Sequence, residues 1–124
     1  MDNRSGKMGE EYTARILMGK GYQILHRNYH SRFGEIDIIA QNEQFIVFVE
    51  VKTRAEHFLV HPFEAITVSK QNKILKTAAA YLAEHPTALQ PRFDAAALLT
   101  DSSGKQVVSV EYLESAFEAA GTFL

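Results

Sequence analysis

Residues 34–52 read GEIDIIAQNEQFIVFVEVK, and we expect them to form the centre of the fold. Two runs rich in β-branched and aromatic residues flank a short polar turn, which predicts a β-hairpin with a half-buried surface. Asp37, Glu50 and Lys52 nevertheless lie inside the apolar runs. Charged side chains are rarely buried unless they are paired or bind a metal, so these three residues need such a partner.

The hairpin brings the charged residues to one face of the sheet. Side chains alternate between faces along a strand, so Glu50 and Lys52 share a face. A four-residue turn at 41–44 would place Asp37 on that face, diagonal to Glu50, with the two Cα atoms about 7–8 Å apart. The same register would set Glu35 opposite Glu50. Three carboxylates so close together are unfavourable without a positive charge between them, so we expect a divalent cation here.

The ligand types narrow the choice of cation. The chain has no cysteine, so it offers oxygen ligands, which suit Mg²⁺ or Mn²⁺ better than zinc. The five histidines lack the spacing of paired metal ligands and are expected to be non-ligands. An alternative makes Glu50 and Lys52 a structural ion pair on a half-exposed sheet face, but it leaves Asp37 and Glu35 unexplained.

Length and composition predict one ordinary globular domain over residues 1–124. The chain is 46% hydrophobic and 23% charged, and it is long enough for one hydrophobic core but not for two. No apolar run approaches the roughly 20 residues of a membrane helix, and no apolar signal segment opens the sequence. We therefore expect a cytoplasmic protein without membrane contact.

The charge is small overall but unevenly distributed. The net charge of -2 argues against a surface covered by basic residues. Residues 1–80, however, hold 11 of the 13 basic residues against 9 of the 15 acids. Any contact with a polyanion should therefore fall on this part of the chain. The candidate contacts are Arg27, Arg32, Arg54, Lys70 and Gln71.

Two helices are predicted by apolar residues at helical spacing. The first spans 5–20, and Glu10 lies at the edge of its apolar stripe, where it can point inward. Taken alone, Glu10 would be a solvated acid near a helix N-terminus. The second helix spans 67–85 and stops before Pro86. The expected buried stripes are Met8, Tyr12, Ala14, Ile16 and Leu17 in the first helix, and Ile74, Leu75, Ala78, Ala79 and Leu82 in the second.

Further strands are predicted on both sides of the hairpin. A first strand is expected at 22–26, and the segment 27–34 that follows is expected to be a loop whose basic and aromatic residues suit phosphate contact and base stacking. A buried strand and an edge strand are expected at 92–99 and 105–110, the latter with Val108 and Val110 facing inward, before a short helix or tail at 111–124. For Asp94 we expect a structural hydrogen bond to a nearby backbone group.

The order of these charged residues resembles a known class of nucleases. A helix carrying Glu10, a strand carrying Asp37 and the run Glu50-Val51-Lys52 resemble the PD-(D/E)xK, or restriction-endonuclease-like, superfamily, and archaeal Holliday junction resolvases in particular. The chain is most similar to the YraN-like family of predicted bacterial nucleases. The residues that carry this resemblance are Gly6-x-x-Gly9-Glu10, Gly21-Tyr22, Arg27-Asn28, Gly34-Glu35-Ile36-Asp37, Phe48 to Arg54 and Arg92-Phe93-Asp94. Leu59 departs from the family pattern, in which many relatives are expected to have glycine.

The resemblance implies an α/β fold of the restriction-endonuclease-like type, with a mixed central β-sheet of about five strands flanked by helices, as a single endonuclease-like domain. It implies that Asp37 and Glu50 bind Mg²⁺ or Mn²⁺, that Glu10 reaches the metal directly or through water, and that Lys52 lies beside the scissile phosphate. These four residues would form the catalytic set. Such a metal acidifies water and neutralises charge on the phosphate, and an ammonium group adds a compact positive donor.

The implied reaction is phosphodiester hydrolysis that leaves a 5′-phosphate and a 3′-hydroxyl. The implied partner is nucleic acid, with DNA favoured and branched DNA suggested by the resolvases, a substrate that a symmetric homodimer would suit. The alternative is a non-catalytic nucleic-acid-binding or assembly module that keeps the nuclease-like fold.

Overall fold

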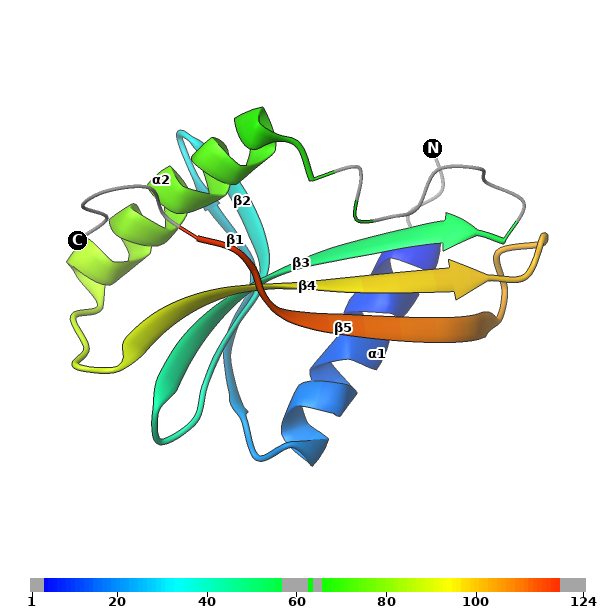
Figure 1. The fold of residues 1–124 in the computed structure, drawn as a ribbon, viewed down its shortest axis with the longest axis horizontal. Coiled ribbons are helices and arrows are strands. Elements are labelled where there is room, and N and C mark those ends of the chain that lie inside the picture. The colour runs from blue at the N-terminus through cyan, green and yellow to red at the C-terminus, as the bar shows by residue number, and fades with distance from the viewer. Residues whose placement is uncertain (1–3, 57–62, 64–65, 119–124) are drawn as a thin grey trace.

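A computed structural model describes residues 4–56, 63 and 66–118 (Figure 1). One five-stranded sheet, ordered β1-β2-β3-β4-β5, forms the centre of the described part of the chain. Strands β3 and β4 are parallel, and the other neighbours are antiparallel. The elements are α1 (Arg4–Gly19), β1 (Gln23–Ser31), β2 (Gly34–Gln41), β3 (Phe45–Ala55), α2 (Val68–Glu84), β4 (Gln90–Thr100) and β5 (Val107–Phe117). This mixed α/β architecture is consistent with a restriction-endonuclease-like fold.

The two helices cover opposite faces of the sheet (Figure 1). Alternate residues of the central strands supply both apolar faces. Phe48 of β3 packs in the cluster on the α2 side, whereas Val47 and Val49 pack in the cluster on the α1 side. Helix α2 contributes Ile74, Ala78, Tyr81 and Leu82, and α1 contributes Ala14 and Leu17. Neither helix is long and apolar enough to cross a membrane.

Both predicted helices are present, but α1 fully buries only Ala14 and Leu17 of its expected stripe. The predicted limits agree with the observed ones within a residue, and the Thr67 hydroxyl caps α2 by accepting a hydrogen bond from the Lys70 N–H at 3.2 Å. Tyr12 is 45% exposed, because α1 turns a narrow face toward β3. That buried face consists of Gly9, Thr13, Ala14 and Leu17.

The predicted hairpin register is wrong by two residues. The Asn42 N–H donates to the Phe45 carbonyl at 3.0 Å, and Gln41 pairs with Ile46, so the loop is shorter than the four residues expected. The Asn42 side chain causes this tightening, because its Oδ1 accepts hydrogen bonds from the N–H groups of Gln44 and Phe45. A shift of two residues keeps every side chain on its face of the sheet.

Three strand predictions also need correction. The segment predicted as a loop at 27–34 continues β1 to Ser31, because its polar residues line the exposed edge of the sheet. Strand β5 extends to Phe117, where a helix or tail was expected, and Phe117 stacks on Phe93 with 5.3 Å between ring centroids. Val108 does not face inward but is 51% exposed. Leu59 and residues 119–124 lie outside the described residues.

Candidate functional site

Strands β2 and β3 part at Asp37. Their paired register runs from Gln41 opposite Ile46 to Ile38 opposite Val49, and one further step would set Asp37 opposite Glu50. The Val51 N–H instead donates to Asp37 Oδ2 at 2.7 Å. The Asp37 carboxylate, in a residue only 7% exposed, therefore replaces a backbone acceptor at the point where the strands separate.

Glu50 and Lys52 lie beside this carboxylate. The Glu50 carboxyl is close enough to Asp37 to raise the pKa of that residue. Lys52 Nζ lies 3.5 Å from Glu50 Oε1, and both side chains are nearly buried, at 12% and 11% exposure. The structural ion pair considered from the sequence thus exists, but it leaves Asp37 as a second acid in the same cluster.

Burial and a neighbouring acid make Asp37 unusual. Burial, followed by the Glu50 carboxyl, raises the pKa of Asp37 to about 8, while the Val51 N–H and Lys52 act in the opposite direction. Two adjacent carboxyl groups in this environment favour a shared proton or a bound cation. Asp37 and Glu50 offer only oxygen atoms as ligands, and these suit Mg²⁺ or Mn²⁺.

The first turn of α2 brings a second lysine to the same place. The pKa of Lys70 is lowered, first by burial and then by the neighbouring Lys52 ammonium, while Glu50 and Asp37 oppose the shift. Two acids and two lysines therefore interact across β2, β3 and α2. Lys70 is one of the predicted nucleic-acid contacts, and the structure brings it beside this cluster.

Glu10 approaches the cluster from the α1 side. Burial, followed by the Asp37 carboxyl, raises the pKa of Glu10, and Asn28 Nδ2 donates to Glu10 Oε1 at 3.2 Å. Gly9 allows this approach, because a Cβ there would lie 2.1 Å from Thr53 Oγ1. No three Asp, Glu or His side chains within the described ranges are grouped closely enough to hold a metal ion, so Glu10 stands apart from the acid pair.

The predicted cluster of three carboxylates on the sheet is wrong. In the observed register Glu35 no longer faces Glu50, and it binds His30 of β1 instead, with Nε2 and Oε2 2.6 Å apart. The tighter turn at Asn42 is the physical reason, because it moves Glu35 by two positions relative to β3.

The predicted nucleic-acid contacts are spread over the molecule. Arg27 lies on the α1 side, where it binds Glu11 at 2.8 Å. Arg32 lies at the β1–β2 turn, and Arg54 donates to the Thr53 carbonyl at 2.9 Å. Gln71 donates to the Ile66 carbonyl at 3.2 Å and lines a small pocket of about 110 Å³ with Ala95 and Phe117. Among the five candidates, Lys70 interacts electrostatically with Glu50 and Asp37.

Asn28 is a site residue that sequence reasoning did not select. It has a positive φ of 53°, a conformation that asparagine tolerates better than most residues, and its side chain reaches Glu10. The available signal was its place in the Arg27-Asn28 motif that carries the family resemblance, within a segment predicted as a loop.

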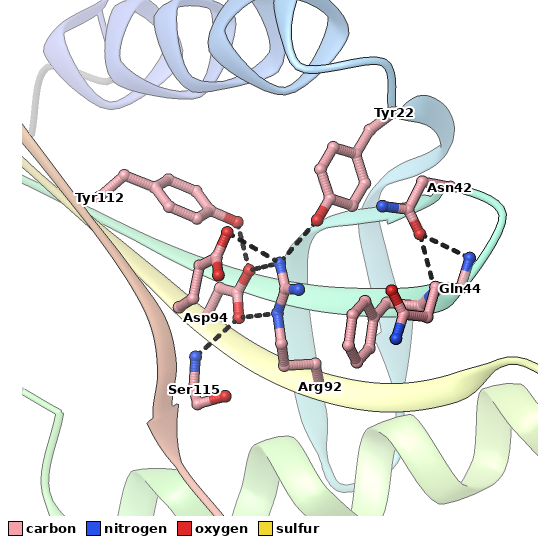
Figure 2. Close-up of polar contacts among 9 residues, drawn as sticks. Tyr22, Asn42, Gln44, Arg92, Asp94, Tyr112 and Ser115 are labelled. Carbon is pink, nitrogen blue, oxygen red and sulfur yellow. Dashed lines mark hydrogen bonds and ion pairs between the residues drawn. The ribbon is translucent and has the colours of Figure 1, made fainter.

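A second polar network on the α1 face is structural (Figure 2). The fully buried Asp94 accepts hydrogen bonds from Arg92 Nε and Nη2, from the Tyr112 hydroxyl and from the Ser115 N–H, at 2.6–3.0 Å. Arg92 also donates to the Tyr22 hydroxyl at 2.8 Å. Each carboxylate oxygen of Asp94 is thus bonded twice, which confirms the expected structural bond to a backbone group and ties β5 to β4.

Comparisons with known proteins point to one family. A family model described as "Uncharacterised protein family UPF0102" matches residues 9–98. A UPF0102 protein of Prosthecochloris aestuarii is 42% identical over 92% of this chain and 93% of its own length. UPF0102 proteins of Dictyoglomus turgidum and Pelobacter propionicus are 40% and 42% identical, over 94% and 96% of this chain and 100% and 86% of their own lengths.

Proposed function

The chain belongs to the UPF0102 family, and we propose that it is a metal-dependent nuclease that hydrolyses nucleic-acid phosphodiesters, with DNA as the preferred substrate. The observation that carries the proposal is the buried Asp37 beside Glu50 and Lys52, where two strands separate. A buried acid with a raised pKa and a specific charged neighbour is typical of functional sites.

Asp37 and Glu50 would hold Mg²⁺ or Mn²⁺, which supplies Lewis-acid stabilisation of the phosphate and acidifies water. The Val51 N–H orients the Asp37 carboxylate, and Lys52 forms an ion pair with Glu50. Glu10, held by Asn28, would support the pair from the α1 side.

The lysines supply the positive charge that a phosphodiester requires. Lys52 and Lys70 converge on the acid pair, so a bound phosphate would meet two ammonium donors there. Water would attack phosphorus, and the bond from phosphorus to the 3′ oxygen would break as that oxygen gains a proton. Donors fixed where negative charge develops contribute strongly to such a reaction.

Cleavage of labelled single-stranded, duplex and four-way branched DNA with Mg²⁺ or Mn²⁺ tests the proposal. Glu50→Gln and Lys52→Met should each lower the rate by about 10²- to 10³-fold. Matched controls are Glu43→Gln in the exposed β2–β3 turn and Lys105→Met between β4 and β5, which should cut like the wild type. Equal cleavage rates for the wild type and all variants would show that a contaminant cuts the DNA, and the proposed nuclease function would then be wrong.

One observation favours a second candidate, a non-catalytic nucleic-acid-binding or assembly module. In the described part of the chain the acid pair has no third Asp, Glu or His close enough to complete a metal site. This function would be preferred if salt-sensitive binding of DNA or RNA survived Glu50→Gln while no divalent ion supported cleavage by the wild type.

A further inference from the structure

The turn between β1 and β2 presents Phe33 on a fixed support. The Phe33 N–H donates to Ser31 Oγ at 3.0 Å, and Ser31 Oγ donates to Thr77 Oγ1 of α2 at 3.1 Å. A Cβ on Gly34 would lie 3.5 Å from Lys73 Cβ, so the backbone of the turn rests against α2. Figure 1 shows this turn beside α2. The turn that carries the Phe33 ring is therefore held against α2.

The Phe33 ring is exposed and flanked by cations. The residue is 36% exposed and belongs to neither apolar cluster of the described residues. The Arg32 guanidinium lies 4.9 Å from the ring centroid, and Lys76 Nζ lies 5.9 Å from it. Single-stranded nucleic acids are bound by this combination, because bases stack on aromatic rings while cations contact the phosphates.

A row of lysines joins this ring to the acid pair. Lys70, beside Lys52, and Lys73 and Lys76, beside the turn, are spaced three residues apart on α2 and so lie on neighbouring turns of the helix. Six helical residues advance about 9 Å along the axis. A short stretch of nucleic acid can therefore contact the acid pair and the Phe33 ring together.

We propose that Phe33 stacks on an unpaired nucleobase close to the scissile phosphate, so the substrate class is nucleic acid with unpaired bases, in a single strand or at a branch. This inference rests on the proposed nuclease function and specifies its substrate. Bases inside a duplex are already stacked on their neighbours, so their faces are closed to the ring.

The absence of tryptophan from the sequence allows a direct test. Phe33→Trp would introduce a single tryptophan, whose emission should be quenched on titration with a short oligothymidylate in EDTA and should be unchanged with a paired duplex. Tyr12→Trp, at an exposed position on α1, is the matched control and should not be quenched by either ligand. Equal quenching of the two variants, or quenching of Phe33→Trp by duplex alone, would overturn the proposal.

Affinity provides the second readout. Phe33→Ala and Phe33→Leu should each weaken oligothymidylate binding by about tenfold and leave duplex binding unchanged, and Phe33→Tyr should restore the affinity. Wild-type affinity in Phe33→Ala would overturn the stacking proposal, whereas the nuclease proposal would stand if Glu50→Gln still abolished cleavage. A wild-type protein that neither binds nor cuts nucleic acid would overturn both.

Discussion

Asp37 gives the site a pH dependence that can be measured without metal. Its pKa rises from an ordinary value of 3.8 to about 8, because it is buried beside Glu50. The folded state thus keeps a proton that the unfolded chain releases between these two values. The contribution of this proton to the free energy of unfolding is complete below the pKa of Asp37 in the unfolded chain. It is lost as the pH rises through the pKa of Asp37 in the folded protein.

We expect the free energy of unfolding in EDTA to fall from about pH 4 to pH 8, by up to about 1.4 kcal/mol per pH unit, and then to level off. Asp37→Asn should flatten this part of the profile, because the amide does not titrate. Denaturant titrations across the pH range measure the effect, with Glu43→Gln as the control. A profile of the same slope in Asp37→Asn would show that another group binds the proton.

Among single residues, the sequence identifies the acids of the site but not the neighbouring residues that hold them in place. Asp37 and Glu50 stand out because a charge within an apolar strand is costly. Asn28 does not stand out, because its contact with Glu10 depends on a left-handed backbone conformation and on the position of α1. A linear pattern contains neither of these facts.

At the scale of elements, the contact between α1 and β3 depends on Gly9. An added Cβ would lie 2.1 Å from Thr53 Oγ1 and 3.4 Å from Val51 Cγ1. Gly9→Ala should therefore destabilise the protein by about 1–3 kcal/mol, although alanine is the better helix former. Gly6→Ala, with open space around its Cβ, should stabilise the protein by up to about 1 kcal/mol.

A double-mutant cycle separates this clash from helix propensity. Thr53 Oγ1 is buried and has no hydrogen-bond partner among the described residues, so Thr53→Ala breaks no hydrogen bond. Thr53→Ala should recover much of the stability lost in Gly9→Ala, as measured by thermal and denaturant unfolding. Additive effects of the two substitutions, or a stable Gly9→Ala protein, would contradict the close contact.

The limits of the helices could be predicted from the sequence, but the hairpin register could not. Apolar spacing and the stop before Pro86 are local signals, and the predicted limits of both helices agree with the observed ones within a residue. The register depends on whether the Asn42 side chain closes the turn early, which the turn composition does not settle. The predicted placement of Asp37 and Glu50 on one face of the sheet survives this error, because a two-residue shift preserves the faces of a strand.

Over the whole molecule the net charge is only -2, but the charged residues are unevenly distributed. The sequence indicates that basic residues collect before residue 81. It does not indicate that Phe33 and Gly34, in the β1–β2 turn beside Arg32, lie against Lys76 and Lys73 of α2, because these contacts join segments about forty residues apart in the chain. The fold therefore builds a local basic surface on a protein that is acidic overall.

This surface predicts how binding should depend on salt. Each lysine that neutralises a phosphate of a single strand adds about 0.7 to the slope of log K against log salt concentration. The double variant Lys73→Gln/Lys76→Gln should lower that slope by about 1.4, whereas Lys105→Gln, between β4 and β5, should leave it unchanged.

Fluorescence anisotropy with oligothymidylate in EDTA, over a series of salt concentrations, measures the slope. Phe33→Ala should lower the affinity at every salt concentration without changing the slope, because stacking releases no counterions. An unchanged slope in the double lysine variant would remove α2 from the binding surface. A reduced slope in Phe33→Ala would mean that the ring acts by positioning Arg32 or Lys76, and stacking would no longer explain its exposure.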